Sequence, residues 1–204
     1  CPKGNRPYQF FAKHGLSATG GAHSMLGDLM LSVSATPFSE VIANDGTSSK
    51  PVVYMKPGAG YRGLDQMLVD NQIVPYDVGS LESVFTRLAL KVKAEGVGIV
   101  RATGKKAEDL ERWCDETDVA CWVHDISDSR DINDLLLESA HPHTGVIIVK
   151  GKVKMGKQLE DKSRIRWCME TSVCSNTDTF LQGLAGRCMG YLASGTHKGT
   201  KIYV

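Results

Sequence analysis

The chain has 204 residues, with 24 Lys and Arg against 23 Asp and Glu, so its length fits one large domain or one domain with part of another. The near balance of charge singles out no charged partner for the whole chain, and no apolar run approaches the roughly 20 residues that a membrane helix needs. Six cysteines occur without a C-x-x-C pair, which favours reduced, buried thiols over a disulfide framework or a zinc site. We therefore expect a soluble cytoplasmic protein without a metal site; no signal peptide is visible.

The N-terminal part of the sequence predicts little regular structure apart from one strand. Residues 1–28 are polar and Gly-rich without a clear period. An apolar run at 29–34 (LMLSVS) predicts a buried strand, which ends at Pro37 because the residue before a proline is restricted to extended geometry. Ser34 and Thr36 flank Ala35 directly after this strand, where their hydroxyl groups can bond across a cleft or serve as ordinary turn residues.

A turn-dense segment follows a linker-like stretch at 44–50 (NDGTSSK) and a short predicted strand at 52–55. Its glycines, Gly58, Gly60 and Gly63, fit the letters G-x-G-x-x-G of a dinucleotide-binding loop. That loop requires a helix next and an acidic residue at the end of a second strand about 20 positions on. The apolar run at 64–69 is too short for this helix and no such strand follows, so we expect no dinucleotide cofactor.

From residue 80 onward the sequence alternates between helical and strand-like patterns. Apolar residues recur at i, i+3, i+4, i+7, i+8 and i+11 from Leu81 to Val92, which predicts an amphipathic helix that Gly96 ends. Continuous apolar strands separated by helices indicate βαβ units and a parallel sheet covered on both faces. The predicted strands are 97–102, 121–126, 146–149 and 164–170, and the predicted helices are 107–116 and 132–139.

The loop after the third of these strands has the letters of a phosphate-binding loop. Residues 151–157 (GKVKMGK) match G-x-x-x-x-G-K, but Gln158 stands where Ser or Thr would hold magnesium, and the next strand follows too soon for a helix. The loop belongs to a run of basic residues that forms a predicted local cationic patch, in which a solvated surface is the ordinary alternative. The basic residues of the run are Lys150, Lys152, Lys154, Lys157, Lys162, Arg164 and Arg166.

A last helix is predicted over 177–191 (TDTFLQGLAGRCMGY), with its apolar residues at helical spacing. Gln182 and Arg187 are the two residues of this helix whose side chains are suited to binding. Gln182 has an amide that can bond to a base, a ribose or a loop, and Arg187 is a planar cation suited to phosphate oxygens. The final residues KIYV read as a strand cut short. Together with a first residue that is Cys1 and not Met, they suggest a piece of a longer protein.

In this order the segments resemble the later motifs of superfamily 2 (DEAD-like) helicases. The tripeptide Ser34–Thr36 is similar to the SAT motif, Gly156 and Lys157 to the Gly-containing fifth motif, and Gln182 to Arg187 to the Q-x-x-x-G-R sixth motif. The resemblance spans most of the chain from about residue 29, and the ending LQGLAGRCMGY is most similar to phage and large-virus helicases. Helicases of this superfamily usually carry a second arginine three residues after the first, where this chain has Gly190.

The resemblance implies a three-layer RecA-like fold and the hydrolysis of ATP in a cleft between two such domains. By resemblance Arg187 would reach the γ-phosphate and Gln182 would help to orient it. Ser34, Ala35, Thr36, Gly156 and Lys157 would couple the nucleotide to DNA or RNA, which Lys150, Lys152 and Lys154 would contact. ATP and Mg²⁺ would be bound mainly by a missing N-terminal RecA-like domain.

These implications divide the chain into residues 1–43, the end of a first RecA-like domain; 44–79, a connecting segment; and 80–204, the second domain. We expect the 204-residue chain alone not to hydrolyse ATP, and its location to be the cytoplasm, of the host if the protein is viral. Two alternatives stay open: a non-catalytic nucleic-acid-binding domain that uses the cationic patch, and a P-loop phosphotransferase that uses residues 151–158.

Overall fold

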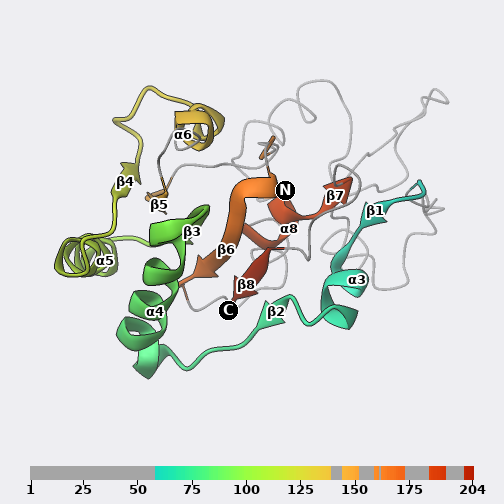
Figure 1. Ribbon diagram of the computed structural model, residues 1–204, viewed down its shortest axis with the longest axis horizontal. Helices are drawn as coiled ribbons and strands as arrows, with labels where there is room; N and C mark the ends of the chain where they lie inside the picture. Colours follow the sequence, from blue (N-terminus) through green and yellow to red (C-terminus); the bar gives the residue numbers. More distant parts are fainter. Residues whose placement is uncertain (1–57, 139–143, 152–158, 161, 173–183, 192–199) are drawn as a thin grey trace, which may run out of the picture. The chain divides into compact units, whose positions relative to one another are not determined.

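The computed structural model describes residues 58–138, 144–151, 159–160, 162–172, 184–191 and 200–204. The chain divides into two units, 1–56 and 57–204, and all of the described residues belong to the second. Its strands and helices follow one another along the chain as Figure 1 shows. They are β1 (Tyr61–Arg62), α3 (Leu64–Val69), β2 (Ile73–Val74), η1 (Val78–Ser80), α4 (Leu81–Ala94), β3 (Val97–Arg101), α5 (Lys105–Glu116), β4 (Cys121–His124), α6 (Ile132–Glu138), β5 (Gly145–Val149), η2 (Lys162–Arg164), β6 (Ile165–Glu170), α8 (Leu184–Cys188), β7 (Gly190–Tyr191) and β8 (Lys201–Tyr203).

A six-stranded sheet in the order β2-β8-β6-β3-β5-β4 forms the centre of this unit. Every adjacent pair in it is parallel, so the carboxyl ends of all six strands meet at one edge. β3 lies between β5 and β6, and its last residue Arg101 is level with Val149 on one side and Glu170 on the other. The predicted α/β class with a parallel sheet is confirmed.

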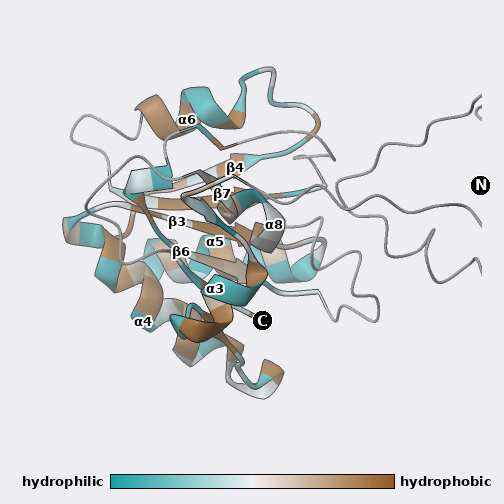
Figure 2. Ribbon diagram, turned by 90° about the vertical axis from the view of Figure 1, so that its right-hand side faces the viewer, coloured by the Kyte–Doolittle hydropathy of each residue, from teal (hydrophilic) through white to brown (hydrophobic). Residues whose placement is uncertain are grey.

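Helices cover both faces of the sheet because successive strand residues point to opposite sides. On one face, Val100, Ile148 and Met169 pack with α4 and α5. On the other, Ile99, Ile147 and Cys168 pack with α3, α6 and α8. Figure 2 shows the result, with apolar colour along the strands and alternating colours along α4. The predicted three-layer arrangement is therefore present.

The elements after residue 80 begin and end close to where the sequence predicts. α4 buries the residues of the predicted apolar face, among them Phe85, Leu88 and Val92. Gly96 follows this helix with a φ of +84°, in the left-handed region that glycine tolerates best. A side chain there would also meet Arg166, whose Cγ lies 2.5 Å from an ideal Cβ position. The end of α4 and the start of β3 thus depend on this glycine.

The last predicted helix is shorter in the structure than in the sequence analysis. Of the predicted range 177–191, residues 177–183 lie outside the described residues. α8 is helical over Leu184–Cys188, and Gly190 and Tyr191 form the strand β7, which pairs antiparallel with β1. The prediction that the helix continues to Tyr191 is wrong because Gly190 has a φ of +123°, which a helix cannot accommodate.

The segment 58–79 contributes to the core, although the sequence analysis assigned it to a connection. Met67 of α3 is buried, and β2 extends the sheet by pairing with β8. α3 has six residues and β2 has two, so neither is long enough to show a helical or strand periodicity in the sequence. The predicted terminal strand at 201–204 is present as β8.

The described residues hold no helix that is long and apolar enough to cross a membrane. Cys114, Cys121, Cys168 and Cys188 are free thiols. The prediction of buried thiols is confirmed for Cys114, Cys168 and Cys188 and is wrong for Cys121, which is partly exposed. Several predicted site residues lie outside the described residues: Ser34, Ala35, Thr36, Lys152, Lys154, Gly156, Lys157 and Gln182.

Candidate functional site

The carboxyl edge of the sheet contains a point at which neighbouring strands lead to opposite faces. β3 continues through residues 102–104 into α5, which packs on one face. After β6, its neighbour, the next described helix is α8, which packs on the other face. In open parallel α/β sheets, ligands bind outside the carboxyl ends of the strands at such a switch point. The ends of β3 and β6 are therefore where a ligand site is expected.

An ion pair joins the last residues of these two strands. Nε of Arg101 lies 2.6 Å from Oε2 of Glu170, and the Glu170 side chain is only 5% exposed. The second carboxylate oxygen of Glu170 accepts hydrogen bonds from the backbone N–H of Ser172, at 3.0 Å, and from its hydroxyl group. Both oxygens of the buried carboxylate are thus satisfied, as burial of a charge requires.

The backbone around this ion pair is held by Thr171 and by side chains from the face of the sheet that α4 and α5 cover. Thr171 donates through its N–H and its hydroxyl to the carbonyl oxygen of Arg101, at 3.1 and 2.8 Å. Lys106, in the first turn of α5, donates to the carbonyl of Thr171 at 2.6 Å. Tyr76 donates to the carbonyl of Glu170 at 2.9 Å. Burial, and then the Glu170 charge, raise the pKa of the Tyr76 hydroxyl. The ends of β3 and β6 are fixed relative to each other.

Arg187 belongs to α8, which packs on one face of the sheet. The helix packs on the sheet through Leu184 and Cys188, and the Cys188 Sγ lies 3.4 Å from that of Cys168, two residues before Glu170. Arg187 is 8% exposed. Its pKa is lowered first by burial and second by the positive charge of Arg101. We refer to Arg101, Glu170, Ser172 and Arg187 as the carboxyl-edge cluster.

This cluster contains two guanidinium groups in a partly desolvated position. Guanidinium geometry suits the oxygens of carboxylates and phosphates. The arrangement can therefore bind an anionic ligand such as a phosphate.

Lys162 fixes the end of the helix that carries Arg187. Its ammonium group donates to the carbonyl oxygen of Met189, and burial lowers its pKa. A cation is favourable at this position because the last carbonyl groups of a helix carry partial negative charge. Lys162 therefore has a structural partner, which limits its use as a ligand-binding residue.

The predicted cationic patch at 150–166 is divided by the sheet. Lys150 directly follows β5, at the carboxyl edge, whereas Arg164 and Arg166 stand at the start of β6, at the opposite edge. Because the strands are parallel, residues close in sequence lie at opposite ends of the sheet. The prediction of one local patch is wrong for these three residues.

The described cations of this run also have partners within the protein. Arg164 donates to the carbonyl of Leu136, at the end of α6, at 2.9 Å. Arg166 pairs with Glu95, and Lys150 lies 3.9 Å from Glu111. Of these, Lys150 has the position that the helicase-like interpretation requires, at the carboxyl edge.

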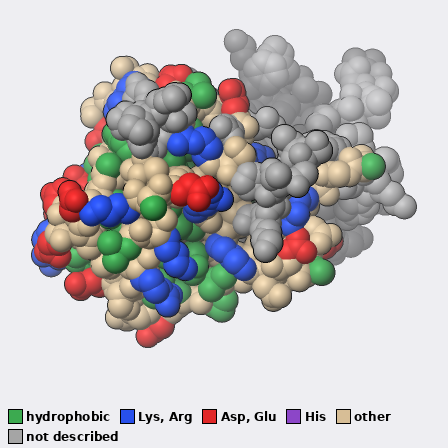
Figure 3. Space-filling model, viewed as in Figure 1, with side chains coloured by type: hydrophobic (Ala, Val, Ile, Leu, Met, Phe, Trp, Pro, Cys, Tyr) green, Lys and Arg blue, Asp and Glu red, His purple; other side chains and the backbone are tan. Residues whose placement is uncertain are grey.

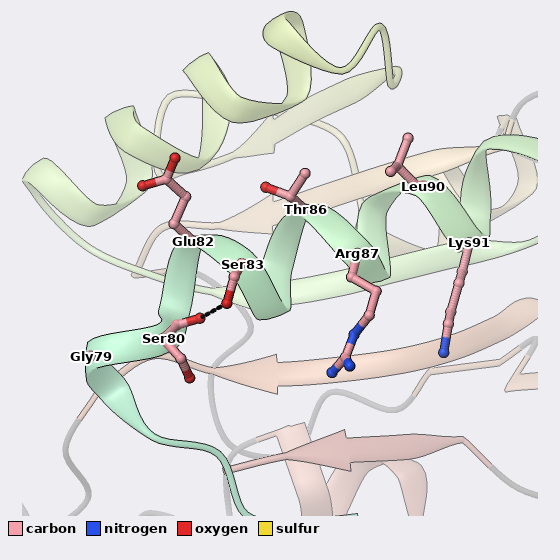
Figure 4. A pocket seen from close by; sticks show the side chains of 8 residues that line it. All are labelled: Gly79, Ser80, Glu82, Ser83, Thr86, Arg87, Leu90 and Lys91. Atoms are coloured by element: carbon pink, nitrogen blue, oxygen red, sulfur yellow. Dashed lines mark hydrogen bonds between the residues drawn. The ribbon is translucent and has the colours of Figure 1, made fainter.

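A shallow hollow of about 840 Å³ runs along the outer surface of α4. Figure 4 shows Arg87 and Lys91 pointing to one side of it, with Thr86 and Leu90 on the other. Lys and Arg side chains are spread over this face of the molecule among acidic ones (Figure 3). The residues that line the hollow belong to η1 and α4, which adjoin in the sequence. Because none of its lining residues comes from another part of the fold, we give the hollow no functional role.

Of the two predicted catalytic residues, Arg187 lies in α8 and is buried, while Gln182 lies outside the described residues. Sequence reasoning missed Arg101 and Glu170. Each is a charged residue that ends an otherwise apolar strand (VGIVR and IRWCME), and a charge at the carboxyl end of a buried strand is a signal that could have identified them.

A metal centre is not supported by the part of the chain that the structure describes, which contains no group of three or more His, Cys, Asp or Glu placed to hold a metal ion. His124, at the end of β4, is buried, and its Nδ1 lies 3.2 Å from Oδ2 of Asp128. Asp128 in turn pairs with Arg130, which explains this histidine as part of a structural network.

Comparison with known proteins gives limited matches. No family model matches the sequence. The chain is similar to an uncharacterised protein of Acanthamoeba polyphaga mimivirus, with 25% identity over 175 residues, which cover 78% of this chain and 42% of the relative. The chain thus spans less than half of that relative's length.

Among solved structures, the chain is similar to the E. coli DEAD-box protein SrmB in its complex with regulator of ribonuclease activity A. The TM-score is 0.46 and the identity 18%, over 65% of this chain and 75% of that chain. A likeness of this extent concerns the outline of the fold and assigns no role to any residue.

Proposed function

We propose that this chain is part of an ATP-dependent nucleic-acid helicase or translocase, in which Arg187 belongs to the ATP cleft. The observation that carries the proposal is a buried arginine, Arg187, on a helix that packs against a parallel sheet, with the charge of Arg101 acting on it. Arg101 ends β3 at the carboxyl edge, where such sheets bind ligands, and the cluster has the hydrogen-bond donors that a polyphosphate needs.

In this proposal the chemistry of Arg187 is electrostatic. ATP and Mg²⁺ are held mainly by a preceding RecA-like domain, and closing the cleft brings the guanidinium of Arg187 to the γ-phosphate. There it stabilises the negative charge of the phosphoryl-transfer transition state, an effect worth roughly 10³–10⁵ in kcat for arginine fingers of nucleotide hydrolases. The buried position of Arg187 supports this role because the interaction is stronger where water is excluded.

The nucleic acid would follow the same edge of the sheet. Lys150 stands directly after β5 at the carboxyl edge, and Lys152, Lys154, Gly156 and Lys157 come next in the sequence. Lysines that contact a phosphate backbone contribute an attraction that weakens with salt. We propose that Lys150, Lys152 and Lys154 contact DNA or RNA and that Gln182 assists Arg187 in the ATP cleft. The residues that couple the strand to the nucleotide are Ser34, Ala35, Thr36, Gly156 and Lys157.

The experiment compares variants of the protein expressed from its complete gene, using steady-state ATPase activity with and without single-stranded DNA or RNA. We expect Arg187→Ala to lower kcat at least 100-fold while binding of the strand, measured by fluorescence anisotropy, changes less than threefold. The matched control is Arg112→Ala, which removes an arginine of α5 that is 58% exposed, away from the cluster; we expect it to be active.

Three outcomes separate the candidate functions. An Arg187→Ala variant with normal ATPase activity would refute the proposed role of the arginine. Strand binding without any ATPase activity in the complete wild-type protein would favour the alternative of a non-catalytic nucleic-acid-binding domain. ATP hydrolysis by the 204-residue chain alone would contradict the need for a second domain and would favour the P-loop alternative at residues 151–158.

A further inference from the structure

We propose that Arg101 is a second phosphate-contacting residue of the same cleft, held ready by Glu170. The inference rests on the proposed function and adds a residue that the sequence comparison did not indicate. It assigns to the carboxyl-edge cluster a pair of guanidinium groups, one from β3 and one from α8, that act on one polyphosphate ligand.

The first argument is the face of the sheet to which Arg101 belongs. Alternation along β3 places it on the same side as Val97 and Ile99, which pack in the core beneath α3, α6 and α8. α8 carries Arg187 and packs on that same face. The two arginines therefore belong to the same face of the sheet, one at the end of a strand and one on a helix that covers that face.

The second argument concerns which atoms of Arg101 are engaged. The ion pair with Glu170 uses Nε, at 2.6 Å. A guanidinium group has five N–H donors, of which four are on the two Nη atoms. Among the described residues, Glu170 is the acceptor that holds this side chain, so the Nη groups can donate to a ligand while the ion pair persists.

The third argument is that Glu170 is suited to positioning and poorly suited to binding a ligand. One of its oxygens pairs with Arg101, and the other accepts from Ser172, so neither is left for a ligand. Arg101, in contrast, is 26% exposed, so its guanidinium is accessible from the edge. The buried acid orients the arginine and the arginine faces the solvent side, where a ligand would enter.

The chemistry of the two arginines supports a ligand that carries phosphate groups. A guanidinium group presents a planar set of N–H donors that matches phosphate oxygens. A single phosphate oxygen that lies between the arginines would accept from both, and such charge-assisted bonds are about twice as strong as neutral ones. A polyphosphate chain fits this better than a neutral sugar or base.

The test uses the protein from its complete gene and the ATPase assay described above. We expect Arg101→Ala to lower kcat 10- to 100-fold. We expect the double variant Arg101→Ala/Arg187→Ala to be no more than about threefold worse than Arg187→Ala alone, because residues that act as a unit are not additive. Arg101→Lys keeps the positive charge but loses the planar set of N–H donors of a guanidinium group. We expect this variant to lose at least fivefold in kcat with an unchanged midpoint of thermal unfolding.

A second readout separates a ligand contact from a purely structural role. Millimolar guanidinium chloride, well below denaturing concentrations, should restore part of the activity of Arg101→Ala, since a free guanidinium ion can occupy the vacated position. The matched control is Arg112→Ala, whose activity the added salt should not raise. If Arg101→Ala fails to fold, Arg101→Lys decides the question by its kcat alone.

The outcomes distinguish this inference from the proposed function on which it rests. If Arg187→Ala is inactive while Arg101→Ala and Arg101→Lys keep kcat within twofold of wild type, the role of Arg101 is refuted and that of Arg187 stands. If none of the variants changes kcat, the proposed function itself fails. Loss of activity in Arg101→Ala without rescue, and with a lowered unfolding temperature, would reduce Arg101 to a structural residue.

Discussion

Replacing Gly98 by alanine tests the contact that holds β3 against β6 and thereby brings Arg101 beside Glu170. An ideal Cβ at position 98 would lie 2.1, 2.3 and 2.6 Å from Cζ2, Cε2 and Cη2 of Trp167. The ring cannot move away easily because it is 2% exposed, its Nε1 donates to the carbonyl of Leu88 at 2.9 Å, and it packs edge-on against Phe85.

The expected cost follows from these distances. Overpacking a dense core by one carbon typically costs about 1–3 kcal/mol, and a rigid, buried neighbour places Gly98→Ala at about 3 kcal/mol. Trp167→Phe alone should cost on the order of 2 kcal/mol, from the lost hydrogen bond and the unfilled volume. Because the smaller ring leaves room for the new methyl group, the double variant should be about 1–2 kcal/mol more stable than the sum of the single changes predicts.

The assay is urea denaturation followed by far-UV circular dichroism, with the four proteins of the double-mutant cycle side by side. Gly104→Ala is the matched control. Gly104 has a positive φ of +55°, and nothing lies within 4 Å of its ideal Cβ position. Its replacement by alanine therefore carries only the backbone cost of about 1–2 kcal/mol, without a steric clash. Strictly additive effects of Gly98→Ala and Trp167→Phe would refute the proposed packing of β3 on β6.

Two further predictions concern the pH dependence of stability and the divided basic run. The pKa of Tyr76 is raised in the folded protein by burial and by Glu170; its contribution to the free energy of unfolding should be complete below the unfolded value of about 10 and fall as the pH rises through the folded value. The difference in stability between wild type and Tyr76→Phe, measured in urea, should therefore shrink between pH 9 and 11, and a constant difference would contradict the assignment. Arg164→Ala should lower stability by about 1–2 kcal/mol, since its guanidinium bonds to the end of α6, yet leave unchanged the salt slope of nucleic-acid binding in the complete protein; a slope reduced by about 0.7–0.9 would instead place Arg164 on a phosphate.

Patterns that repeat over long segments made most of the described sheet predictable. The amphipathic run from Leu81 to Val92 and the apolar strands at 97–101 and 145–149 are long enough for periodicity and burial to agree. β1, β2 and β7 have two residues each, so they carry no periodicity, and they exist because partners distant in the sequence complete them. Tertiary pairing, which a local pattern does not contain, decided these elements.

The candidate site was accessible to sequence reasoning only where one residue type carried the chemistry. Arg187 was singled out from its neighbours in the sequence, and its predicted role stays a prediction. Arg101 was not singled out, because its pairing with Glu170 depends on the register of β3 and β6, which are 69 positions apart (170 minus 101). The prediction of one cationic patch at 150–166 was wrong for a related reason. Lys150 follows the end of β5 and Arg164 precedes the start of β6, so the two lie at opposite edges of the parallel sheet although they are close in the sequence.

The short stretch around Arg187 is tethered on both sides of that residue. Leu184 and Cys188 anchor α8 on the sheet, and immediately beyond it Gly190 and Tyr191 are tied to β1 in an antiparallel ribbon. The backbone of Arg187 is thus ordered when the chain folds. Under the proposed function, a ligand that binds this arginine would order only its side chain, so the entropic cost of binding would be small.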